Sequence, residues 1–185
     1  MELQTFYKFF ISTAILSSVF IGPAFNLLIF LNTYILESHW SIFIDDVAFA
    51  NLMALSFIVF CLILIISMKF VEKITKEPLI ITGIIIIAFS CIYAGLTWVW
   101  EIVILAFIIT SSTIAFLIPV IIKYTSDKIE KGYENSRYIF VLPISTLLWI
   151  MISFTLFAFI GDAWRLLYFV AGGINIISAI VIGLI

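Results

Sequence analysis

Charged residues are scarce in this sequence: Lys, Arg, Asp and Glu make up only 11% of its 185 residues, while 65% are hydrophobic. Soluble domains contain about 25% charged residues. A water-soluble globule has too little interior to bury so large an apolar fraction, so lipid must cover much of the surface. The sequence therefore predicts an integral membrane protein whose first partner is the lipid bilayer.

Metal ligands and catalytic motifs are sparse as well. The sequence has one histidine and two cysteines, Cys61 and Cys91, which both lie inside apolar runs. It contains no C-x-x-C, no H-E-x-x-H and no glycine-rich phosphate loop. We therefore expect no metal, no cofactor and no enzymatic activity. A net charge of −2 offers no basic surface for nucleic acid either.

Long apolar runs are what the sequence does contain. Charged residues, glycines and prolines divide it into six of them, at about 9–36, 47–68, 79–98, 102–122, 138–160 and 164–185. An α-helix needs about 20 residues to cross the hydrocarbon core of a bilayer. The alternating polarity of a membrane β-strand is absent. We predict an all-α fold, with residues 1–185 forming a single domain of six transmembrane helices.

The basic residues predict how these helices are oriented. If Lys8 lies inside, the inner side holds eight basic residues and the outer side holds only Arg165; the eight are Lys8, Lys69, Lys73, Lys76, Lys123, Lys128, Lys131 and Arg137. Basic residues collect on the cytoplasmic side of membrane proteins. We therefore expect a multi-pass protein of the cell membrane with both termini in the cytoplasm. Trp98, Trp100 and Trp164 fall at outer helix ends, where indole rings anchor at headgroup depth.

Polar residues inside the apolar runs are the candidates for a solute path. They are Asn26, Asn51, Thr110 and Asn175. The alternative for each is a structural hydrogen bond between helices or within its own helix, because an unpaired amide is costly in lipid. Proline should also disturb three of the helices, at Gly22-Pro23, at Pro119 and at Pro143.

Two motifs resemble those of the major facilitator superfamily of transporters. The loop between the second and third helices of that family reads roughly G-x-L-x-D-R-x-G-R-R-P. With Pro78 aligned to its proline, Glu72 takes the place of the acid, Lys73 that of the next base, and Lys76 that of the first paired base. Residues 161–169, Gly-Asp-Ala-Trp-Arg-Leu-Leu-Tyr-Phe, are similar to the family's G-x-x-W-R-x-x-F at the start of the sixth helix.

This resemblance implies an N-terminal six-helix half of such a transporter, which moves a small solute by alternating access. Glu72, Lys73 and Lys76 would then form a conformational latch. The implied partner is a second six-helix half, either further along the same chain or on another subunit. The family's fourth-helix arginine would fall near Phe107 and is missing, which argues against proton-driven drug export. The alternative function is a non-transporting membrane scaffold or assembly protein.

Overall fold

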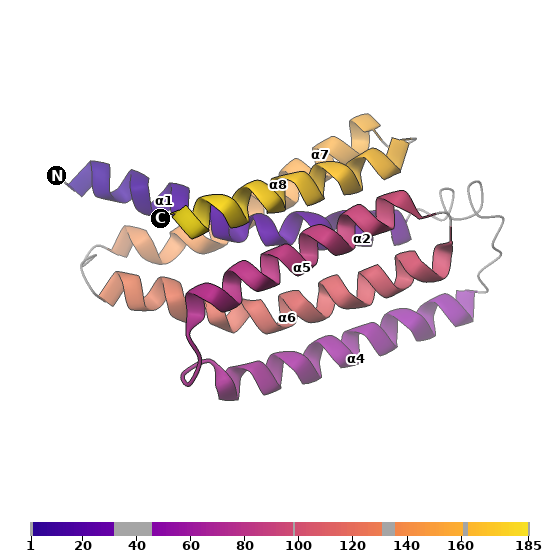
Figure 1. Ribbon diagram of the computed structural model, residues 1–185, viewed down its shortest axis with the longest axis horizontal. Helices are drawn as coiled ribbons and strands as arrows, with labels where there is room; N and C mark the ends of the chain where they lie inside the picture. The colour runs from indigo at the N-terminus through magenta and orange to yellow at the C-terminus, as the bar shows by residue number, and fades with distance from the viewer. Residues whose placement is uncertain (1, 32–45, 98, 131–135, 161–162, 185) are drawn as a thin grey trace.

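The computed structural model describes residues 2–31, 46–97, 99–130, 136–160 and 163–184, and these ranges are helical apart from short turns (Figure 1). The elements are α1 (Glu2–Ser17), η1 (Ser18–Phe20), α2 (Ile21–Leu31), α4 (Asp46–Phe70), α5 (Lys76–Leu96), α6 (Trp100–Glu130), η2 (Ser136–Phe140), α7 (Val141–Ile160) and α8 (Trp164–Leu184). The all-α prediction is thus confirmed for the described part of the chain.

Five helical segments are long and apolar enough to cross a membrane: Leu3–Phe25, Lys76–Leu96, Glu101–Ile129, Arg137–Ile160 and Trp164–Leu184. In α4 the apolar stretch found among the described residues is shorter, at Ala54–Phe70. These segments indicate a membrane protein, because a helix of about 20 apolar residues matches the thickness of the hydrocarbon core.

Two helix ends differ from the predicted ones. The first helix begins at Glu2 rather than near residue 9, and α6 continues to Glu130 rather than ending near residue 122. Hydropathy marks where a helix leaves the hydrocarbon, not where its backbone hydrogen bonds stop. The polar end of α6 stays helical, and an ion pair between Lys123 and Asp127 at i,i+4 spacing supports it. Residues 32–36 of the first predicted segment lie outside the described residues.

Pro23 and Pro143 have the same effect, and Pro119 has a different one. Between α1 and α2 the helix changes to 3₁₀ geometry at Ser18–Phe20, a segment that includes Val19. The carbonyl of Val19 would be the i−4 acceptor of the N–H that Pro23 lacks. Pro143 is likewise the third residue of α7 and follows the 3₁₀ segment η2, which includes its i−4 residue, Ile139. The helix geometry thus changes just before Pro23 and just before Pro143, whereas Pro119 lies inside α6, which continues past it.

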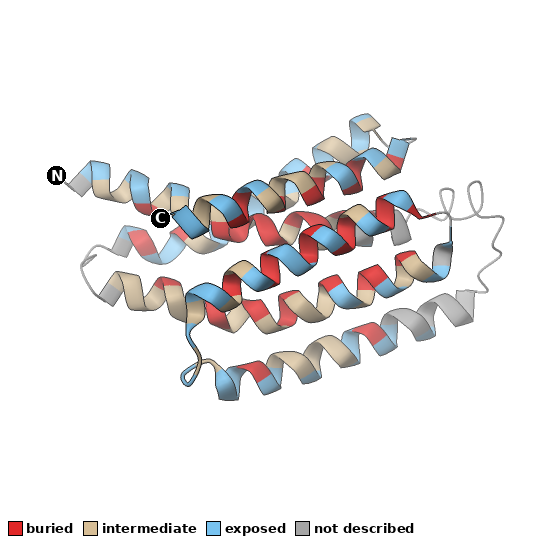
Figure 2. Cartoon of the chain, in the orientation of Figure 1, coloured by how far each residue is buried: buried red, intermediate tan, exposed pale blue. Residues whose placement is uncertain are grey.

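The helices pack in two layers. One layer is a row in the order α4, α6, α1–α2 and α7, and the other is the pair α5 and α8. In Figure 1 this pair passes in front of α2 and α7. The α5–α8 contact is the most extensive one among the described helices. The pair also packs on α6, through α5, and on α1–α2 and α7, through α8. Figure 2 shows buried residues facing the interior between the layers and exposed residues facing outward.

Small residues bring α5 and α8 close together. Buried positions on each helix recur every three or four residues, which produces one continuous inward stripe. The stripe of α5 includes Gly95 and that of α8 includes Gly172, each opposite a backbone carbonyl of the other helix: those of Arg165 and Ala88, respectively. Such residues let membrane helices approach closely and gain van der Waals contact.

Trp164 does not anchor at the membrane surface as predicted. Its side chain is only 1% exposed and packs edge-to-face on Tyr168, with ring centroids 6.0 Å apart. The Trp164 side of the first turn of α8 therefore packs in the protein interior, whereas Leu166 in the same turn is exposed. Trp98 lies outside the described residues, and of Trp100 the structure describes only the helical backbone.

One end of the bundle collects the basic residues. The start of α1, the turn between α4 and α5, and the ends of α6 and α8 all lie at the same end, at the left of Figure 1. We call it the basic end, because Lys69, Lys73, Lys76, Lys123 and Lys128 lie on these segments. Both chain termini are at this end (Figure 1). The side of the membrane that it faces stays a prediction.

Candidate functional site

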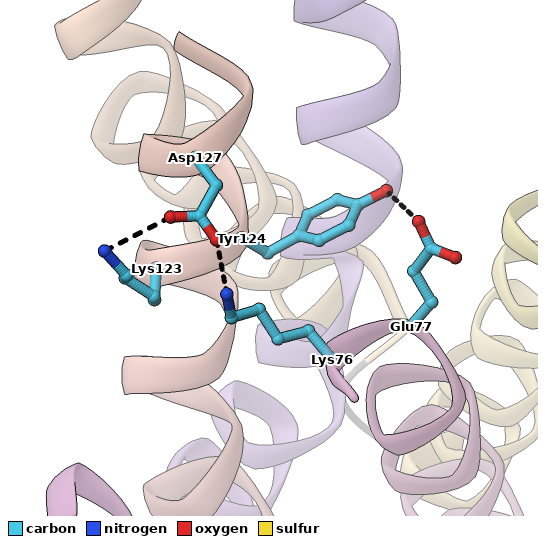
Figure 3. A network of polar contacts seen from close by, with 5 residues as sticks. All are labelled: Lys76, Glu77, Lys123, Tyr124 and Asp127. Carbon is cyan, nitrogen blue, oxygen red and sulfur yellow. Dashed lines mark hydrogen bonds and ion pairs between the residues drawn. The ribbon is translucent and has the colours of Figure 1, made fainter. Parts of the chain in front are cut away.

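Three charged side chains meet between α5 and α6 at the basic end (Figure 3). The ammonium of Lys76, in the first turn of α5, donates to Oδ2 of Asp127 near the end of α6. The Nζ of Lys123 lies 3.2 Å from Oδ1 of the same carboxylate. The side chains of Lys76 and Asp127 are 22% and 28% exposed. Partly solvated pairs contribute at most about 1 kcal/mol to stability, so this pair sets the position of two helix ends more than it stabilises the fold.

A second polar contact lies beside the first. The hydroxyl of Tyr124, on α6, donates to Oε1 of Glu77 on α5 at 3.4 Å (Figure 3). The ammonium of Lys128, one turn further along α6, lies 4.6 Å from the centre of the Tyr124 ring. This distance is within the range of a cation–π interaction. The phenol of Tyr124 therefore lies between the carboxylate of Glu77 and the ammonium of Lys128.

These groups border a cavity of about 200 Å³ at the basic end. Its polar lining comes from Ser12 of α1, Glu77 of α5, and Tyr124 and Lys128 of α6. Apolar side chains of α1, α5 and α8 complete the wall, together with Gly183. Among the described residues, no group of three or more His, Cys, Asp or Glu side chains is placed to hold a metal ion. What the cavity offers a ligand is one negative group, one positive group and hydroxyls.

The residues predicted to form a latch are only partly brought together. Lys76 is paired, but its acid is Asp127 rather than Glu72. Glu72 and Lys73 are exposed in the turn after α4, and neither forms an ion pair with any residue that the structure describes. The alignment favoured Glu72 because it takes the place of the acid in the family's loop motif. The sequence did contain one indication of Asp127: it lies four residues after Lys123, a spacing that favours a helix continuing through both residues.

The residues predicted to line a path do not share one surface. Asn51 is exposed on α4, whereas Thr110 and Asn175 are fully buried in α6 and α8. The Thr110 hydroxyl lies 2.9 Å from the carbonyl oxygen of Ala106 in its own helix. Asn26 lies in α2, but its side chain is outside the described part. For Thr110 these contacts match the structural alternative rather than a path.

Asn175 carries the one amide oxygen that is buried without a hydrogen-bond partner among the described residues. Its Nδ2 donates to the carbonyl oxygen of Ala171, 2.9 Å away, in the preceding turn. A buried unpaired oxygen costs about 1–3 kcal/mol. Leucine has the same branching and no such cost, so we expect Asn175→Leu to raise the melting temperature in detergent by several degrees. A fall in melting temperature would show that the oxygen has a partner that the structure does not show.

Comparisons with known proteins gave no match for this chain, whether with protein-family models, with curated proteins or with solved structures.

Proposed function

We propose that this chain is a transporter half: a six-helix bundle that moves a small solute by alternating access together with a second six-helix half, in the manner of the major facilitator superfamily. In this proposal α4, which is 25 residues long, is the sixth span, and the basic end faces the cytoplasm of the cell. The positive-inside rule supports that orientation.

The observation that carries the proposal is a symmetry in the packing. We take α1–α2, α4 and α5 as one set of three helices, and α6, α7 and α8 as a second set. Exchanging the sets in chain order maps most of the contacts onto one another, although the α7–α8 contact has no equivalent of that extent between α4 and α5 among the described residues. The contact of α4 with α6 becomes that of α7 with α1–α2, and the contact of α5 with α6 becomes that of α8 with α1–α2. The contacts α5–α8 and α2–α6 map onto themselves.

The two sets run through the bundle in opposite directions. The helix α1–α2 starts at the basic end, whereas α6 ends there (Figure 1). This is the arrangement of an inverted-topology repeat, which major facilitator transporters carry within each six-helix half. In such transporters two repeats or halves rock against each other around a fixed site. A scaffold protein has no need for this symmetry.

Hydrogen bonds within the row of α4, α6, α1–α2 and α7 follow the same exchange of helices. The Ser67 hydroxyl of α4 lies 3.4 Å from the carbonyl oxygen of Ala115 in α6. In the corresponding pair of helices, Nε1 of Trp149 in α7 donates to the carbonyl oxygen of Ala14 in α1 at 2.6 Å. The second and fifth helices of the proposed repeats thus both bind an alanine carbonyl of the helix beside them.

The Lys76–Asp127 pair supports a moving role for the basic end. The pair connects α5, the last helix of the first set, to α6, the first helix of the second set. It therefore lies at the interface between the two proposed repeats. A partly exposed pair is weak enough to open and re-form as the sets move. We assign it the latch role that the family resemblance implied for Glu72, Lys73 and Lys76 together.

A non-transporting scaffold is the second candidate. It is favoured by the burial of Thr110 and Asn175, which bond within their own helices instead of facing a shared path. In that case the spans only pack and bind lipid.

Uptake into proteoliposomes tests the proposal. We expect vesicles with the wild-type chain to take up at least one member of a panel of labelled sugars, amino acids and quaternary ammonium compounds faster than empty vesicles. Lys76→Gln should slow that uptake about 10-fold, equivalent to about 1.4 kcal/mol, while Lys76→Arg keeps the charge and most of the rate. Lys123→Gln is the matched control, because Lys123 pairs with the same Asp127 from within one helix.

The panel also decides between the two candidates. If no solute of the panel enters faster than into empty vesicles, transport of these solutes by paired copies of this chain is refuted and the scaffold function is favoured. If uptake occurs but Lys76→Gln and Lys123→Gln behave alike, transport stands and the latch role of Lys76 is refuted.

A further inference from the structure

Two opposite charges in the cavity at the basic end have no ion-pair partner among the described residues. Glu77 and Lys128 both line it, yet neither forms an ion pair with any residue that the structure describes. The neighbouring Lys76 and Lys123 do not supply one, because both bind Asp127. The carboxylate of Glu77 and the ammonium of Lys128 line the same cavity and do not pair with each other. They could therefore bind a ligand that has one positive and one negative group.

Tyr124 lies between Glu77 and Lys128 and contacts both. Its hydroxyl binds Glu77 and its ring face lies under Lys128. A ligand ammonium beside Glu77 would donate to the carboxylate and to the Tyr124 oxygen. A ligand anion beside Lys128 would accept from that lysine. The Ser12 hydroxyl, which already donates to the carbonyl oxygen of Phe9, is left as an acceptor on the cavity wall.

The size of the cavity limits the ligand. A cavity of about 150 Å³ holds benzene, so about 200 Å³ has room for a group only slightly larger. A primary ammonium joined to a phosphate through two carbons has this size and both charges. Amino acids carry the same pair of signs, but the position of the cavity favours a phosphate.

The cavity lies where a membrane protein meets lipid headgroups. Glu77 is in the first turn of α5, Lys128 is in the last turn of α6, and Gly183 is at the end of α8. All three lie within two residues of the end of a helical segment that is long and apolar enough to cross a membrane. Lipid phosphates are abundant at this depth and attract lysines there.

We propose that this cavity binds a phosphoethanolamine group, with the ammonium at Glu77 and Tyr124 and the phosphate at Lys128. The group is supplied either as the headgroup of phosphatidylethanolamine or as a free solute. This site does not depend on the proposed transport, because it lies inside one six-helix bundle and needs no second half.

Gly183 gives a way to fill the site without disturbing the fold. A Cβ added there would meet only the Cδ1 atom of Ile81, at 3.9 Å, which is ordinary van der Waals contact. Both residues line the cavity. Gly183→Leu therefore places a side chain at the cavity wall without a clash. Gly173→Leu is the matched control, because a Cβ at Gly173 meets nothing within 4 Å and this glycine does not line the cavity.

Native mass spectrometry of the full chain in detergent tests the proposal. The protein is given equal amounts of phosphatidylethanolamine and phosphatidylcholine with identical acyl chains. We expect about a tenfold preference for phosphatidylethanolamine, because the trimethylammonium of choline has no N–H to donate. Glu77→Gln should abolish the preference, whereas Lys128→Gln and Gly183→Leu should reduce retention of both lipids. Glu72→Gln and Lys73→Gln alter exposed charges at the same end and should change nothing.

A second arm identifies the source of the group. The melting temperature is measured with millimolar phosphoethanolamine and no added lipid. Stabilisation that Glu77→Gln removes assigns the site to a free solute, and lipid preference without that stabilisation assigns it to a headgroup. Equal retention of both lipids with no effect of phosphoethanolamine overturns the proposal. So does a lipid preference that Glu77→Gln leaves intact in a variant with the wild-type melting temperature.

Discussion

Replacing Trp164 with alanine is expected to destabilise the protein by about 3 kcal/mol. The indole is 1% exposed, at the start of α8, and it is among the largest fully buried side chains. Removing it leaves a void beside Tyr168, against which it packs edge-to-face. In a membrane protein the transfer of apolar surface from water contributes little, so the loss is mostly van der Waals contact.

The measurement is thermal unfolding in detergent, followed by the loss of helical circular dichroism. For a chain of this length about 3 kcal/mol corresponds to a shift of roughly 10 °C. Leu166→Ala is the matched control, since Leu166 is in the same helical turn but 49% exposed. If both variants melt together near the wild-type temperature, the first turn of α8 lies at the membrane surface, as the sequence alone suggested.

The contrast between these two residues shows what hydropathy can predict. The sequence correctly predicted a helix from residue 164, because an uninterrupted apolar run of this length has few other structures in lipid. It could not tell which side of that helix meets protein. In a lipid-covered bundle both sides are apolar, so the amphipathic stripe that orients a soluble helix is missing. Trp164 was therefore read as a surface anchor.

The candidate site was harder to predict for a related reason. The lysines were predicted to lie in loops between the helices, because charge is costly in hydrocarbon. The structure places Lys73 in such a turn but Lys123 and Lys128 on the last turns of α6. The partner of Lys76 was not predicted, since Asp127 is 51 positions away and the prediction ended the fourth helix near residue 122. The extension of α6 to Glu130 carries Tyr124, Asp127 and Lys128 into the site. Because the fourth helix was predicted to end too early, neither the ion pair nor the cavity was predicted.

Replacing Gly172 with leucine is expected to separate α5 from α8 and to destabilise the protein by more than about 3 kcal/mol. A Cβ at this position would lie 2.5 Å from Cγ1 of Ile92 and 3.1 Å from the carbonyl oxygen of Ala88. The Ile92 side chain can move, but the Ala88 carbonyl belongs to the helical backbone of α5. Relief therefore requires the two helices to move apart along the most extensive contact in the bundle.

The adjacent glycine provides the comparison. A Cβ at Gly173 meets nothing within 4 Å, and leucine has a higher helix propensity than glycine by somewhat less than 1 kcal/mol. Gly173→Leu should therefore melt at or slightly above the wild-type temperature, while Gly172→Leu melts far below it or does not fold. Gly172→Ala should fall between them, because only one methyl group must be accommodated. If the two leucine variants had equal melting temperatures, α8 would be rotated relative to α5, and the packing symmetry on which the transporter proposal rests would lose its central contact.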